Sequence, residues 1–208
     1  MEIEDITQIV TKRTPSMLGR GRFTRFSILV PLIKVNEEVH ILFEIRSSQL
    51  RRQPGEICFP GGKIDATDEN EKHTAIRETM EELGLEETSI TNVSALDYFV
   101  SPFGTIIYPF IGVIKSLEEL RPNPAEVGDV FTVPLSYFQK NPPQIYKIKF
   151  HVEPEKNFPY QDIIGGENYK WQIREMDECF YYYEDKVIWG LTAGILSHFI
   201  EVLEEDQK

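Results

Sequence analysis

The sequence predicts an α/β fold in which a mixed β-sheet is sandwiched between α-helices. Segments 23–35 and 39–46 are apolar or alternating, and they read as strands with a turn at 36–38 between them. A segment with helical spacing follows and ends at Gly84. Further strand-like stretches come after this helix, at 90–100, 105–115 and 130–135. Strands on both sides of a helix in the chain are typical of an α/β/α arrangement.

The C-terminal part predicts a β extension and a final helix. Segments 145–153 and 179–184 read as strands, and 153–166, rich in Pro and Gly, reads as the connector between them. Apolar residues recur at helical spacing from 187 to 205, so we expect a helix there that packs on the sheet. A short helix is expected at 134–141. The aromatic residues of this part suit strand packing or a homodimer surface better than stacking on a nucleotide base: Tyr169, Trp171, Phe180, Tyr181, Tyr182 and Tyr183.

Length and composition indicate a single domain over residues 1–208. A hydrophobic content of 41% is enough to build a sizeable core, and no linker or repeat divides the chain. The net charge of −12 argues against nucleic acid or an anionic membrane as a partner, because both attract basic surfaces. A small-molecule partner is therefore expected.

The cysteine content and the start of the chain predict a cytoplasmic protein. Cys58 and Cys179 are far apart and lack metal-ligand spacing, so we expect reduced thiols rather than a disulfide or a zinc site. Met1–Val10 begins with acidic residues instead of the basic segment of a signal peptide. No apolar run reaches the roughly 18 residues that a membrane-spanning helix needs.

Three glutamates in the predicted helix suggest metal-assisted phosphate chemistry. A helix turns by about 100° per residue, so Glu78, Glu81 and Glu82 share one face. Ala75, Ile76, Thr79 and Leu83 lie on the opposite arc, which we expect to pack on the core and to leave the carboxylates facing outward. The repulsion between them would be relieved by a divalent cation, and oxygen ligands suit Mg²⁺ or Mn²⁺.

The residues before the helix predict a tight loop and a capped helix start. Pro60, Gly61 and Gly62 allow the backbone to turn sharply and to approach a ligand closely. Asp68 with Glu71 three residues later predicts a capping box at the helix start, and Gly84 predicts a left-handed C-cap.

These residues resemble the signature of the Nudix hydrolases, G x5 E x7 R E U x E E x G U, with U apolar. The matching positions are Glu69, Arg77, Glu78, Glu81, Glu82, Gly84 and Leu85. Two positions depart from the signature, because six residues separate Gly62 from Glu69 and because Thr79 stands at the first apolar position. The resemblance implies metal ligation by Glu78, Glu81 and Glu82, a contribution from a Gly61 or Gly62 carbonyl, water-mediated binding by Glu69, and orientation of a carboxylate by Arg77.

A second, overlapping pattern resembles the coenzyme A pyrophosphatase branch of this family. The branch motif LLTxRSx3Rx3Gx3FPGGx aligns with residues 42–63, where Arg46, Ser47, Arg51 and Gly55 are in register. Phe43 and Glu44 replace the Leu and Thr of the motif. The resemblance implies cleavage of coenzyme A or its thioesters into 3′,5′-ADP and 4′-phosphopantetheine or its acyl form, with Arg46 and Arg51 contacting the substrate phosphates or organising the loop.

Several alternatives stay open at this point. The same chemistry suits ADP-ribose, NADH or another nucleoside diphosphate derivative, and a Nudix module can also sense a nucleotide without hydrolysing it. The structural alternative is a solvated acidic helix after a glycine turn. Glu126 is a candidate for a further carboxylate from outside the helix, although a solvated loop acid is the favoured interpretation.

Overall fold

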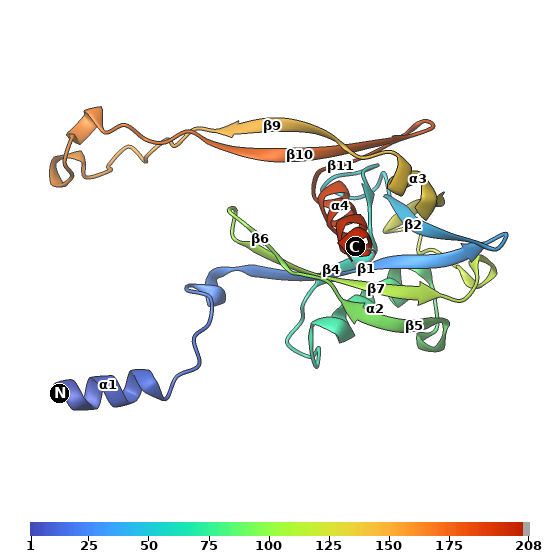
Figure 1. Cartoon of the computed structure of the whole chain (residues 1–208), viewed down its shortest axis with the longest axis horizontal. Helices are drawn as coiled ribbons and strands as arrows, with labels where there is room; N and C mark the ends of the chain where they lie inside the picture. Colours follow the sequence, from blue (N-terminus) through green and yellow to red (C-terminus); the bar gives the residue numbers. More distant parts are fainter. Residues whose placement is uncertain (206–208) are drawn as a thin grey trace.

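The computed structural model of the chain describes residues 1–205, in which a mixed sheet forms the centre (Figure 1). Its parallel central pair is β1 (Thr24–Val35) and β7 (Thr105–Ile114), aligned from Thr24 opposite Thr105 to Ile33 opposite Ile114. All the other strands are antiparallel to their neighbours. Strands β2 (Glu38–Arg46) and β4 (Gly61–Lys63) pair with β1, β3 (Ile57–Cys58) and β8 (Val127–Pro134) pair with β2, and β5 (Ile90–Ala95) and β6 (Phe99–Ser101) pair with β7.

Helices cover both faces of this sheet, so the α/β/α prediction is confirmed. On one face, α2 (Glu71–Leu83) packs on the sheet through a core that contains Leu29, Leu42, Ala75 and Leu83. On the other face, α3 (Leu135–Lys140) and α4 (Gly190–Glu205) pack on a second core, whose buried members include Val30, Ile41, Phe43, Leu196 and Phe199. Because side chains alternate along a strand, β1 and β2 supply both cores.

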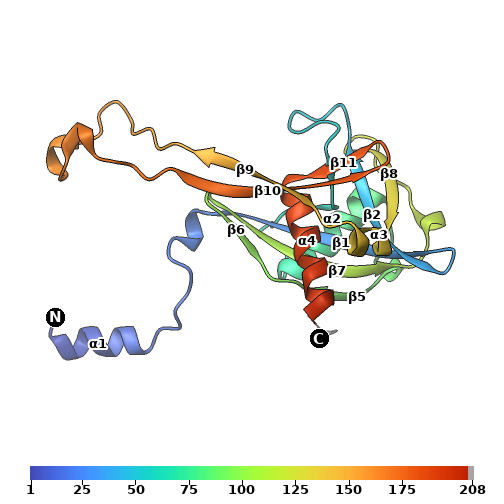
Figure 2. The same cartoon turned by 45° about the horizontal axis from the view of Figure 1, so that its top comes forward.

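A second sheet forms an arm that extends from the domain in both views (Figures 1 and 2). It is built from β9 (Gln144–Phe150), β10 (Arg174–Tyr183) and β11 (Lys186–Trp189), all antiparallel. The predicted β extension is therefore present, but the expected start of the last helix at Val187 is wrong. Val187, Ile188 and Trp189 pair with β10 instead, and Gly190, with φ of +66°, turns the chain into α4.

The N-terminal helix α1 (Ile3–Thr11) was not expected from the sequence, and none of its residues is buried. Both views show it apart from the domain (Figures 1 and 2). The remaining elements are short 3₁₀ turns at Arg20–Arg22, Glu87–Ser89, Leu117–Glu119, Tyr160–Asp162 and Gly166–Asn168. Among the described residues, no helix has the length and apolar character that crossing a membrane requires.

Candidate active site

The two glycines before α2 allow the loop and the helix to approach each other closely. Gly61 and Gly62 pair with Ile28 and Ser27 of β1. A Cβ on Gly61 would overlap the Ser27 carbonyl, and a Cβ on Gly62 would overlap the Glu78 carboxylate. Any other residue at 61 would collide with the backbone of β1, and any other residue at 62 would displace the Glu78 carboxylate, so the two glycines allow Glu78 to lie directly over the loop backbone.

Helix α2 begins at Glu71, later than the predicted capping box requires. Asn70 is the N-cap, and its side chain accepts a 2.9 Å hydrogen bond from the His73 amide. The prediction that Asp68 and Glu71 form the cap is wrong, because Asp68 binds a residue further along the helix. The C-cap prediction is confirmed, since Gly84 is left-handed with φ of +62° and ψ of +43°.

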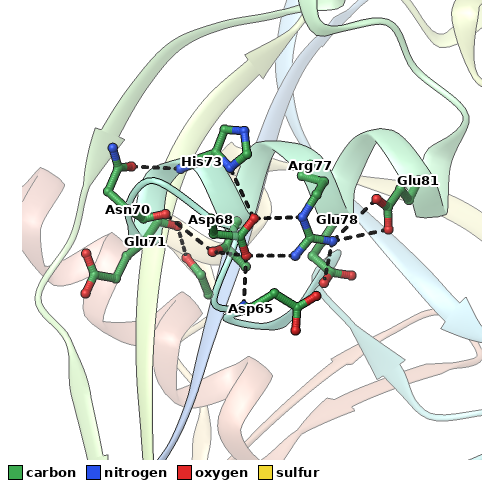
Figure 3. A network of polar contacts seen from close by, with 10 residues as sticks. Asp65, Asp68, Asn70, Glu71, His73, Arg77, Glu78 and Glu81 are labelled. Carbon is green, nitrogen blue, oxygen red and sulfur yellow. Dashed lines mark hydrogen bonds and ion pairs between the residues drawn. The ribbon is translucent and has the colours of Figure 1, made fainter.

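Asp68 forms the centre of a polar network with Arg77 (Figure 3). The Arg77 guanidinium donates to both Asp68 oxygens at 2.9 Å, a bidentate arrangement. Thr74 Oγ1 also donates to Asp68 at 2.8 Å, and the Asp68 side chain is only 1% exposed. The hydrogen bond from Arg77 is the main cause that holds the pKa of Asp68 well below its usual range.

Arg77 also contacts two of the predicted catalytic carboxylates. Its Nη1 lies 2.9 Å from Glu78 Oε1 and 3.3 Å from Glu81 Oε2 (Figure 3). Helical spacing places the Arg77 backbone to one side of the three glutamates, but its side chain reaches two of them. The guanidinium links the buried Asp68 to Glu78 and Glu81, which makes it a positioning group for the helix carboxylates.

Glu82 is buried, contrary to the expectation that all three carboxylates face outward. Its side chain is folded under the loop, where Oε2 accepts a 2.7 Å hydrogen bond from the Gly61 amide. Burial raises the pKa of Glu82, the charge of Glu44 raises it further, and the bond from Gly61 acts in the opposite direction. Glu78 is partly buried and its pKa is also raised by burial, whereas 57% of the Glu81 side chain is exposed.

Glu44 is a fourth carboxylate on this face and was not singled out from the sequence. It is 1% exposed, and Oε1 accepts a 3.1 Å hydrogen bond from the Cys58 thiol of the neighbouring strand β3. Oε2 is buried without a hydrogen-bond partner in the described part of the chain. Burial raises the pKa of Glu44, and burial likewise raises the pKa of Cys58. The sequence did contain a signal that Glu44 is a site residue. It is a charged residue in an apolar strand, and it lies two positions after Leu42 and therefore on the same face.

The end of α2 brings Glu126 to the same cluster. The amides of Arg121 and Asn123 donate to the carbonyls of Leu83 and Glu82, each at 2.8 Å. These bonds satisfy the free end of the helix and fix the loop that carries Glu126. The charge of Glu126 contributes to raising the pKa values of Glu44, Glu78 and Glu82.

Three predicted site residues differ in their surroundings. Arg46 is half-buried at the end of β2, and its Nε is buried without a partner in residues 1–205. Arg51 and Glu69 are exposed. Asp68 rather than Glu69 makes the bond to Arg77. Five residues separate Gly62 from Asp68, which is the spacing between Gly and Glu in the family signature. The metal role of Glu69 and the substrate role of Arg51 stay predictions.

The carboxylate and carbonyl oxygens of this site suit a hard divalent cation, although the carboxylates do not by themselves complete a coordination shell. Within residues 1–205, no three His, Cys, Asp or Glu side chains are grouped so that they could hold a metal ion as they stand. Carboxylates and backbone carbonyls are nevertheless the ligands of Mg²⁺ and Mn²⁺, which commonly retain several waters. The buried, unpartnered Glu44 Oε2 and the mutual repulsion of the cluster are what a cation would relieve.

Comparison with protein families gives one match, to the NUDIX domain, over residues 25–154. The chain is 38% identical over 150 residues to the Mus musculus protein "Peroxisomal coenzyme A diphosphatase NUDT7", covering 70% of this chain and 63% of that protein. It is 30% identical over 187 residues to the Homo sapiens protein "Mitochondrial coenzyme A diphosphatase NUDT8", covering 88% and 71%. The chain thus spans less than two thirds of the mouse protein.

A solved structure supports the same fold. The MutT/nudix family protein from Enterococcus faecalis aligns with a TM-score of 0.53 at 15% identity, covering 98% of this chain and 70% of that one. At this identity the similarity concerns the fold alone.

Proposed function

Because the chain belongs to the Nudix family, we propose that it hydrolyses the diphosphate linkage of coenzyme A or of its thioesters. The products would be 3′,5′-ADP and 4′-phosphopantetheine or its acyl form. The observation that carries this proposal is the cluster of Glu78, Glu82 and Glu44 against the Gly61–Gly62 loop. The substrate follows from the motif at 42–63 and from the names of the mouse and human relatives.

A divalent cation, Mg²⁺ or Mn²⁺, would be held by Glu78, Glu81 and Glu82 with a carbonyl of the Gly61–Gly62 loop, and it would neutralise phosphate charge and lower the pKa of the attacking water. The protein residues prepare this site. The Gly61 amide fixes Oε2 of Glu82 and leaves Oε1 without that restraint. Arg77 holds Glu78 and Glu81 in place and is itself anchored by Asp68.

Arg46 is the best placed of the predicted substrate residues. Its Nε is buried without a partner in the described chain, and burying part of a guanidinium unpaired is costly. A substrate phosphate would satisfy this group, because guanidinium and phosphate match in charge and in hydrogen-bond geometry. Ser47, the next residue, donates to the Pro124 carbonyl at 3.0 Å and so connects this strand end to the Glu126 loop.

The test is hydrolysis of coenzyme A beside ADP-ribose, NADH and diadenosine polyphosphates, with Mg²⁺ or Mn²⁺ and an EDTA control, and with products identified by mass. We expect metal-dependent release of 4′-phosphopantetheine, at a higher kcat/KM than for the other substrates. A preference for ADP-ribose or NADH would contradict the coenzyme A assignment but would support hydrolysis of a diphosphate linkage. No turnover of any substrate would contradict hydrolysis and favour nucleotide sensing.

Arg46→Ala separates substrate recognition from loop structure. We expect it to raise KM for coenzyme A more than for ADP-ribose, because only coenzyme A carries the additional ribose phosphate. An equal effect on both substrates would show that Arg46 acts by organising the loop. The extent of the domain over all of residues 1–208 and the cytoplasmic location also stay predictions.

A further inference from the structure

Helix α1 presents an apolar side that nothing in the described chain covers. Ile6, Ile9 and Val10 are 47%, 54% and 58% exposed, and Ile3 is 74% exposed. At about 100° per residue these four side chains lie on one side of the helix, and Gln8 lies opposite. A helix of nine residues is marginal in water without tertiary packing, so this side requires a partner.

An apolar groove lies at the other end of the connecting segment, where α4, the base of the arm and the β6–β7 turn meet. This α4 groove has a volume of about 620 Å³. Its apolar lining includes Tyr98, Phe99, Phe103, Met176, Leu191 and Ile195. Tyr98 and Phe103 both line the groove and are 61% and 65% exposed, and large exposed aromatic side chains gathered at one groove mark an interaction surface.

The charges of the groove and of the helix are complementary. Asp97, Asp177 and Glu178 contribute carboxylates to the groove lining, where Asp97 lies 3.2 Å from His198 and Asp177 lies 3.0 Å from Lys147. Lys12 and Arg13 directly follow α1, whereas its acidic residues lie in its first turn. The helix would therefore enter with its C-terminal end at the acidic side chains, because this places opposite charges together.

We propose that the α4 groove binds helix α1 of a second copy of this chain, in a reciprocal exchange between two copies. Both views show α1 at a distance from its own α4, on the same side of the domain as the arm (Figures 1 and 2). The segment 12–23 leads directly away from the groove, since the Thr24 amide donates to Gly104 and Thr24 pairs with Thr105, a groove residue. Reciprocal exchange closes a two-fold dimer and covers both apolar surfaces at once.

A native cysteine in the groove provides a direct test. Cys179 lines the groove, whereas Cys58 lies outside it and donates its thiol hydrogen to the buried Glu44 carboxylate. Burial raises the pKa of both thiols. The variant Ile6→Cys, treated with a short bismaleimide, should give a species of twice the chain mass on a denaturing gel. Cys179→Ser in the same background should abolish it, and Gln8→Cys, on the opposite side of the helix, should give far less.

A crosslinked species of single chain mass would overturn the proposal, since it would show that α1 occupies the groove of its own chain. Failure of Ile6→Cys to crosslink through Cys179 would overturn it as well. These results do not depend on substrate, so they are distinguishable from a failure of the coenzyme A assignment.

Oligomeric state gives an independent measurement. We expect sedimentation of the unmodified chain to show a dimer at micromolar concentration, Ile6→Asp to weaken dimerisation by at least about tenfold, and Gln8→Asp to leave it unchanged. Because α1 has no buried residue, Ile6→Asp leaves the domain folded, which circular dichroism can verify. A monomer at all concentrations, or equal dimerisation of both variants, would overturn the proposal.

Discussion

The two faces of the central sheet are built from the same strands but differ in what they bury. On the α4 face, Ile41 and Phe43 of β2 join an apolar core. On the α2 face, Leu42 is followed by Glu44, which is buried against the Cys58 thiol, and Glu82 is buried against the Gly61 amide. At one end, the α2 face therefore buries carboxylates where apolar side chains would add to the core. Because side chains alternate along a strand, four consecutive residues can contribute to the core on one face and to the candidate active site on the other.

The largest expected effect comes from Glu82→Gln on the α2 face. We expect kcat for the preferred substrate to fall by on the order of 10²–10⁴-fold, because a buried carboxylate of the reacting site is lost while its shape is kept. The fold should persist, since the amide oxygen can still accept from Gly61. Glu201→Gln, on the exposed side of α4, is the matched control and should retain full activity. Unchanged turnover in Glu82→Gln would show that the faces do not differ in chemistry.

Arg77→Met should produce the largest loss of stability. It leaves the nearly buried Asp68 without its bidentate partner, which we expect to cost about 3 kcal/mol of unfolding free energy. Urea denaturation with excess EDTA measures this effect. Arg52→Met, in the exposed loop, should change stability by less than about 0.5 kcal/mol. Adding Asp68→Asn to Arg77→Met should recover part of the loss, and additive losses would contradict the pairing.

The sequence predicts the local features of both faces but not the contacts that the folded loop makes on the α2 face. Strand alternation and helical spacing are local, so β1, β2, β7 and α2 were predicted close to their observed bounds. The partner of Asp68 was not predicted. An Asp before a helix can either cap the helix or pair with an Arg on it, and only the folded loop brings Asp68 to Arg77. The burial of Glu82 was likewise missed, because a helical projection does not contain the loop that covers this residue.

Glu44→Thr restores the residue of the branch motif and tests the buried charge. The pKa of Glu44 is raised in the folded protein above its ordinary value of 4.5. Stability from this group is therefore fully present below that value and is lost as the pH rises through the raised folded pKa. For the metal-free protein, we expect Glu44→Thr to raise Tm by about 2–4 °C near pH 8, the shift that roughly 1 kcal/mol produces in a chain of this size.

Near pH 5 the same substitution should have little benefit, because Glu44 is then largely protonated and the Cys58 thiol loses its acceptor in the variant. Thermal unfolding at both pH values, with EDTA present, gives the comparison. Glu201→Thr, an exposed glutamate on α4, should show no such dependence on pH. If Glu44→Thr has the same effect at both pH values, the pKa of Glu44 is not raised in the folded protein.

The smallest expected effect is that of Thr79→Val, one of two buried threonines on α2 that differ in their hydrogen-bond acceptors. Thr79 stands where the family signature has an apolar residue, and its hydroxyl donates to the Ala75 carbonyl of its own helix at 2.7 Å. Thr74 donates to the carboxylate of Asp68. Thr79→Val should change the unfolding free energy by less than about 0.5 kcal/mol, because the carbonyl keeps its helical bond. Thr74→Val should cost about 1.5 kcal/mol, the value of a hydrogen bond to a charged group. Equal costs in urea denaturation would mean that the Thr74 hydroxyl does not contribute to stabilising the Asp68 carboxylate.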